Sequence, residues 1–115
     1  MSKEIKLERT QSTIMRELNL ILQREFPDAE FLNSLSVHEV RLTNDMSVAK
    51  VFYSSMDSEA SIEDIKEEIK EYSKEIRMIL ASKVEMRSVP ELKFEHDNSL
   101  EKANKIEKIL KEIKE

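Results

Sequence analysis

The sequence of 115 residues contains no cysteine and no glycine, and it has only two prolines. Without cysteine there is no disulfide bond, no thiolate metal cluster and no cysteine nucleophile, which fits a reducing compartment. Without glycine there is no phosphate-binding loop of the usual glycine-rich kind. No apolar run approaches the length of a membrane span, and the opening MSKEIKLERTQ lacks the apolar stretch of a signal peptide. We therefore expect a soluble, cytoplasmic protein that does not associate with a membrane.

Length and charge set further limits. A chain of this length makes one domain with a modest core. The formal net charge of −5 argues against a surface that attracts nucleic acid everywhere. The acidic excess lies in residues 28–98, whereas 1–27 and 99–115 each carry one more basic than acidic residue. A basic surface can therefore exist only as a local stripe.

The first half of the chain reads as a helix followed by a hairpin. Apolar residues at three- and four-residue spacings predict a helix over about 4–26, and Pro27 ends it because proline cannot donate a backbone hydrogen bond. Residues 36–55 then read as two strands. We expect their turn to form without glycine because Asn44 and Asp45 tolerate left-handed geometry.

Each strand of this hairpin has one mainly apolar face and one mixed face. In the first strand we expect His38, Val40 and Leu42 to share a face, with Val37, Glu39 and Arg41 on the other. Such strands favour a sheet that helices cover on one side only.

The second half continues with a helix, a strand and a helix. Asp57 or Ser58 can cap the next helix, and Ser61 with Asp64 offers a further capping-box-like start. A long apolar stripe then reaches Leu80, and this helix is either continuous or broken in two. A third strand follows near Val89–Phe94, and Ser99 can cap a last helix. The fold class predicted is α+β, in the order α-β-β-α-β-α. The expected core includes Leu18, Val40, Leu42, Val51, Ile69 and Ile76.

Catalytic and metal-binding signatures are missing. His38 and His96 could bind a metal together with Asp97, but they have no recognised ligand spacing, and two histidines alone seldom make a site. Carboxylates are plentiful, but they crowd helix faces of solvated character, which does not favour a catalytic pair. We therefore expect no enzymatic activity, no cofactor and no metal.

Basic residues of the long middle helix follow helical spacing beside its apolar stripe, namely Lys66, Lys70, Lys74 and Arg77. Glutamates occupy much of the remaining surface. From the pattern alone, a solubilising face paired with acidic neighbours is favoured over a binding surface.

Two stretches carry a more specific signal. The hairpin EVRLTNDMSVAKVFYS (39–54) and the later RSVPELKFEHDNS (87–99) resemble the ribosome-binding factor A family of bacterial small-subunit assembly factors. Between them EIRMILASKVEMR (75–87) resembles the family's Ile-Arg-x-x-Leu pattern, and ERTQSTIMRELNLILQREF (8–26) is similar to its first helix. The resemblance covers nearly the whole chain at matching spacings.

The resemblance implies a KH-like domain of the type II order over 1–98, with a three-stranded sheet covered on one face by helices. A charged helical tail at 99–115 would follow, either mobile or ordered by a partner. The implied function is that of a non-enzymatic factor that binds the free small (30S) ribosomal subunit and its 16S rRNA. It would act late in 30S maturation and rRNA processing, near the 5′-terminal helix of 16S rRNA, and support growth in the cold. Other assembly factors and GTPases are candidate partners, and we expect a monomer.

One position departs from the family's pattern. KH domains approach RNA through a glycine-rich loop, which the family replaces with a kinked Ala-x-Gly, and this chain has Tyr72-Ser73-Lys74 there. Without glycine we expect the helix to bend less sharply or to run nearly straight. The candidate RNA-binding residues implied are Lys70, Lys74, Arg77, Lys83 and Arg87. They would bind mainly through phosphates, because Phe52 is the one candidate for an aromatic side chain on which a base could stack.

Two other functions stay open at this point. One is a generic KH-type binder of single-stranded RNA with no tie to the ribosome. The other is a protein-only adaptor, in which the acidic helix faces dock basic partners and make no direct RNA contact.

Overall fold

The computed structural model describes residues 3–57 and 59–97. The elements in chain order are α1 (Lys3–Arg24), the 3-10 turn η1 (Leu32–Ser34), β1 (Leu35–Leu42), β2 (Val48–Ser55), α2 (Ile62–Lys83) and β3 (Glu91–His96). The helix predicted from Ser99, and with it the proposed boundary between 1–98 and 99–115, lies outside the described residues.

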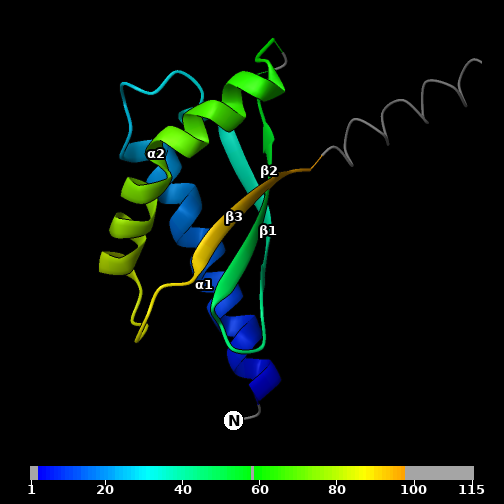
Figure 1. Cartoon of the computed structure of the whole chain (residues 1–115), viewed down its shortest axis with the longest axis vertical. Coiled ribbons are helices and arrows are strands. Elements are labelled where there is room, and N and C mark those ends of the chain that lie inside the picture. Colours follow the sequence, from blue (N-terminus) through cyan, green and yellow to red (C-terminus); the bar gives the residue numbers. More distant parts are fainter. Residues whose placement is uncertain (1–2, 58, 98–115) are drawn as a thin grey trace, which may run out of the picture.

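The three strands form one sheet in the order β1-β2-β3. β1 and β2 are antiparallel, and β2 and β3 are parallel because α2 carries the chain back to the same end of the sheet. Both helices lie on one side of the sheet (Figure 1). The α+β architecture, with a three-stranded sheet covered on one face, is therefore confirmed. None of the helices in the described part is long and apolar enough to cross a membrane.

The core lies between the covered face of the sheet and the apolar stripes of α1 and α2. Its largest fully buried side chains include Leu18 of α1, Val51 and Tyr53 of β2 and Ile76 of α2. Five of the six core residues expected from the sequence are buried. The sixth, Leu42, is partly buried and packs against the core from the end of β1.

A β-bulge in β1 corrects the predicted faces of this strand. Val37 pairs with Tyr53 and Glu39 with Phe52, so that His38 is the extra residue of the bulge and has no paired residue in the register of β2. Val37 and Val40 are consequently both buried, whereas His38 is exposed and its Nε2 lies 2.5 Å from Ser54 Oγ. The expectation that His38 shares a face with Val40 is wrong, because the bulge resets the alternation.

The side chain of Asn19 in α1 holds the bulge. Its Oδ1 accepts a hydrogen bond from Val37 N at 2.8 Å, and its Nδ2 donates to Val37 O at 3.1 Å. The amide therefore satisfies the outward backbone groups of Val37 as a neighbouring strand would. Gln11, two turns earlier in α1, accepts in the same way from Leu42 N at 2.9 Å. These side chains satisfy backbone groups at two positions of β1.

The hairpin turn also differs from the prediction. Neither Asn44 nor Asp45 is left-handed. Among the residues that the structure describes, Met46 has the positive φ, at 60°. Asp45 Oδ1 accepts hydrogen bonds from Thr43 Oγ1 at 2.7 Å and from the hydroxyl and amide of Ser47 at 2.7 and 3.1 Å. This network closes the turn on both sides of Met46 and holds it in a conformation that costs a non-glycine residue on the order of 1–2 kcal/mol.

Helix α2 is continuous but not straight. Every residue from Ile62 to Lys83 is α-helical, Lys74 included, and Ser61 occupies the N-cap position without a side-chain cap hydrogen bond. The axis nevertheless changes direction part-way along (Figure 1). Ser73 Oγ donates to Lys70 O at 3.0 Å, a side-chain contact that competes with the helical ladder and bends helices. Whether this bend is milder than in relatives stays a prediction.

Glu68 fixes the connection between α1 and β1. Its carboxylate accepts three backbone hydrogen bonds, from Glu30 N at 3.1 Å, Phe31 N at 2.8 Å and Leu32 N at 2.9 Å. Successive N–H groups that converge on one anion form a strong, charge-assisted contact. The first half of α2 is thereby attached to the segment that leads into β1.

Substituting Ile69 by alanine is expected to reduce the free energy of unfolding by about 2–5 kcal/mol, because it leaves a cavity in the core. Urea titration followed by circular dichroism measures the change. Met78→Ala on the same helix is the control, since Met78 is 65% exposed and its loss should change stability by less than about 0.5 kcal/mol. Equal effects of the two substitutions would show that the apolar stripe of α2 is assigned to the wrong face.

Glu68→Ala should destabilise the fold by about 1–3 kcal/mol, because three N–H groups lose a charged acceptor. Glu67→Ala is the matched control: Glu67 is exposed on the same helix, with no hydrogen bond or ion pair to any described residue. If the same titration gives both variants the same midpoint, the Glu68 contact does not stabilise the connection.

The hydrogen bonds from Thr43, and then those from Ser47, lower the pKa of Asp45 to about 2. Because this pKa is depressed in the folded protein, the carboxylate stabilises the turn at pH values above its ordinary pKa of 3.8. This contribution is lost as the pH falls toward 2. We expect Thr43→Ala to raise the pKa of Asp45 toward 3.8, measured by NMR titration of the carboxyl carbon. Asn44→Ala should leave this pKa low, and a low pKa in both variants would contradict the assigned cause.

Candidate nucleic-acid interface

The five basic residues expected to bind RNA are all exposed, but they come from different parts of the surface. Lys70, Lys74 and Arg77 lie along the middle of α2, beside its buried stripe. Lys83 is the last residue of α2, and Arg87 lies in the connection to β3. The α2–β3 connection therefore decides which of these side chains meet.

Three of the five meet in one groove of about 520 Å³. We call it the loop groove, and its lining is Lys74, Arg77, Met78, Ala81, Met86, Arg87, Ser88 and Val89. No carboxylate belongs to this lining, although the chain carries more acidic than basic residues. The groove thus combines concentrated positive charge with an apolar wall that includes the exposed Met78, an arrangement suited to an anionic ligand with an apolar part.

Arg77 both lines the loop groove and holds it in shape. Its Nη2 donates a hydrogen bond to Val89 O at 2.7 Å, which ties α2 to the last residues before β3. The neighbouring Pro90 is fully buried, so the far end of the connection is anchored in the core. A guanidinium has five N–H donors, and one contact leaves others for a ligand.

Lys70 and Lys83 lie outside the loop groove. The carbonyl of Lys70 accepts a hydrogen bond from the Ser73 hydroxyl, and Lys83 ends the helix. Lys74 stands where the family pattern has glycine, and it places an ammonium group in the groove from right-handed helical geometry. The Lys74 side chain can therefore contact a phosphate at a position where a close approach of the backbone to RNA would need glycine.

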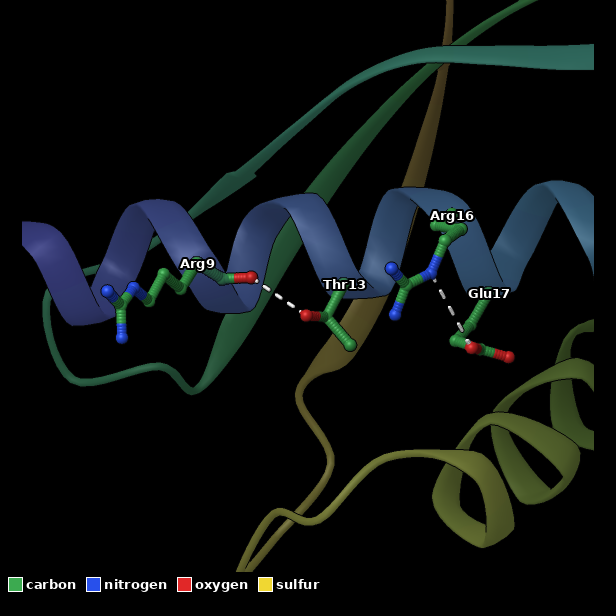
Figure 2. Close-up of polar contacts among 4 residues, drawn as sticks. All are labelled: Arg9, Thr13, Arg16 and Glu17. Carbon is green, nitrogen blue, oxygen red and sulfur yellow. Dashed lines mark hydrogen bonds and ion pairs between the residues drawn. The ribbon is translucent and has the colours of Figure 1, made fainter.

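Helix α1 adds basic residues that the sequence-based prediction did not include. Arg9 and Thr13 lie opposite Val84–Met86 and line a second groove of about 240 Å³ with them. Figure 2 shows Arg9, Thr13 and Arg16 following one another along α1. Their spacing of four and three residues is the signal that could have identified this helix face.

The polar contacts of these α1 residues are local. Thr13 Oγ1 donates to Arg9 O at 2.9 Å, and Arg16 Nε lies 3.9 Å from Glu17 Oε1 (Figure 2). The guanidinium of Arg9 makes no ion pair within the described ranges. On the other side of Met86, Lys6 and Arg87 line a third groove, where Asp45 and Glu85 offset their charge. The loop groove is the more strongly basic of the three.

The aromatic and histidine candidates lie elsewhere. Arg41 Cζ stands 5.2 Å from the centre of the Phe52 ring, on the sheet face that the helices leave open. His96 of β3 packs edge-on against Tyr53, with ring centres 5.7 Å apart, and His38 lies on β1. β2 separates the two histidines. Over residues 3–57 and 59–97, no three histidine or acidic side chains gather where they could hold a metal ion.

Comparison with known proteins gives consistent matches. Residues 6–110 match the family model described as ribosome-binding factor A. The chain is 39% identical over 112 residues to ribosome-binding factor A of Chlorobium phaeobacteroides, covering 96% of this chain and 95% of that one. It is 33% identical over 113 residues to the Staphylococcus carnosus protein of that name, covering 98% and 96%.

Solved structures agree with these matches. The crystal structure of ribosome-binding factor A from Thermus thermophilus superposes with a TM-score of 0.67 at 26% identity, covering 78% of this chain and 94% of that one. A homology model of the Thermus thermophilus factor, fitted into a cryo-EM map of a 30S–RbfA complex, superposes with a TM-score of 0.61 at 23% identity. It covers 76% of this chain and 91% of that one, and this likeness shows the fold.

Proposed function

This chain belongs to the ribosome-binding factor A family, and we propose that it binds the free 30S ribosomal subunit and assists its late maturation. In this role it acts by binding, without catalysis, and contacts 16S rRNA near the 5′-terminal helix while that RNA is processed. The family match and the 30S complex of the Thermus thermophilus relative support the partner. A cytoplasmic monomer, a role in growth in the cold, and contact with other assembly factors or GTPases belong to the same proposal.

The loop groove is the observation that carries the RNA part of the proposal. A protein with net charge −5 is repelled by RNA on average, so a contact with RNA needs a local cluster of cations. Lys74, Arg77 and Arg87 meet this condition in the loop groove. Phosphates would contact these side chains, and the apolar wall would accommodate a sugar or a base edge.

Replacing Lys74 and Arg87 together by glutamine should weaken binding to purified small subunits and make it less sensitive to salt. Each lost contact with single-stranded RNA removes about 0.7 from the slope of log affinity against log salt concentration, so we expect a slope flatter by about 1.4. Arg77 is kept because its hydrogen bond to Val89 shapes the groove. The measurement is a binding titration at several salt concentrations.

The matched control is Lys70→Gln with Lys83→Gln. It removes the same amount of charge, at two candidate positions of α2 outside the loop groove. We expect its salt dependence to stay close to that of the unmodified protein. A flatter slope in the control with no change in the Lys74/Arg87 variant would transfer the contact from the groove to the rest of α2. No change in either folded variant would contradict RNA binding by α2 and its connection.

A further inference from the structure

The sheet face opposite the helices carries a row of three basic side chains across all three strands. Arg41 of β1 pairs with Lys50 of β2, and Lys50 pairs with Lys93 of β3. All three are exposed, and we call them the sheet row. Paired residues point to the same side, and neighbouring strands lie about 4.8 Å apart, so the sheet row spans roughly 10 Å. It shares no residue with the loop groove.

The stability of the sheet does not explain the sheet row. Like charges directly opposite one another on neighbouring strands are destabilising. Glu91 and Glu95 flank Lys93 on the same face of β3, yet the ammonium groups of Lys50 and Lys93 make no ion pair or hydrogen bond with a described residue. Their ammonium groups are therefore available to an external anion, in a chain whose charge is otherwise mostly acidic.

Arg41 is held in place at one end of the sheet row. Its Nε lies 3.1 Å from Glu39 Oε1, and its guanidinium stands over the half-buried Phe52 ring at 5.2 Å. An arginine restrained by a carboxylate and an aromatic ring loses little freedom when it binds a ligand. Its guanidinium can stack on a nucleobase, next to two lysines that can contact phosphates.

We propose that the sheet row binds the phosphate backbone of ribosomal RNA, as a second contact separate from the loop groove. This inference rests on the proposed function, because that function places RNA next to the protein. RNA fits the sheet row better than an acidic polypeptide does, since the row combines aligned cations with a restrained, stackable guanidinium. Two separate contacts on one small domain would let it bind two segments of rRNA at once.

The first test is the salt dependence of binding to purified small subunits for Lys50→Gln with Lys93→Gln. Loss of two phosphate contacts should flatten the slope by about 1.4. The control is Arg24→Gln with Lys66→Gln, which removes the same charge from exposed positions of α1 and α2. Circular dichroism and urea titration verify that each variant is folded.

The outcomes separate this inference from the proposed function. A flatter slope for the Lys50/Lys93 variant than for the control supports the sheet row as a binding surface. A slope equal to the control's overturns the inference. In that case a flatter slope for the Lys74/Arg87 variant leaves the loop groove and the proposed function intact, whereas an unchanged slope there removes both.

A cross-linking test identifies the partner. Because the chain has no cysteine, Glu95→Cys provides a single attachment site for a photoreactive maleimide, two residues from Lys93 on the exposed side of β3. Glu63→Cys, exposed at the start of α2, is the control position. We expect the Glu95→Cys probe to cross-link to 16S rRNA more than the control probe does. Cross-links to ribosomal protein alone, or equal RNA yields from both positions, would overturn RNA as the ligand of the sheet row.

Discussion

The contact of Glu68 with three consecutive backbone N–H groups determines where α2 lies on the sheet. It joins the first half of α2 to the segment that enters β1, while Ile76 and Leu80 bury the second half. Between these two attachments the axis of α2 changes direction (Figure 1), and the Ser73 hydroxyl bonds to Lys70 O in this stretch. The bend directs the end of α2 toward the α2–β3 connection, where Arg77 holds the loop. The loop groove therefore lies where the buried second half of α2 meets the connection that Arg77 holds.

Apolar periodicity was sufficient to predict both long helices, all three strands and five core residues from the six that were named. Burial of a stripe is a property of the element itself, so spacing along the chain reveals it. The bulge at His38 and the left-handed Met46 were not predictable in this way, because both depend on polar side chains that satisfy backbone groups. Asn19 holds the bulge and Asp45 holds the turn. Composition shows that such residues are present, but not which backbone groups they reach.

The candidate site was predicted only in part, because spacing along one helix does not reveal which residues of other segments lie beside it. Helical spacing places Lys74 and Arg77 on one side of α2, and the structure brings them together. Helical spacing could not show that Arg87 joins them, or that Lys70 and Lys83 lie outside the groove, because the path of the α2–β3 connection decides both. The sheet row was equally hidden, since Arg41, Lys50 and Lys93 become neighbours only through the pairing of three strands. Strand register, not sequence spacing, creates that surface.

An acidic protein can bind RNA if its charges are segregated in space. The carboxylates of this chain crowd the exposed faces of α2, where they repel RNA that approaches from an arbitrary direction. The loop groove and the sheet row open on different parts of the surface, and each gathers three cations. Under our proposals, a partner that presents phosphates to these two places would be bound, whereas RNA that approaches from other directions would meet mostly negative charge. Segregation of charge therefore favours RNA whose phosphates reach both places over RNA of arbitrary sequence and shape.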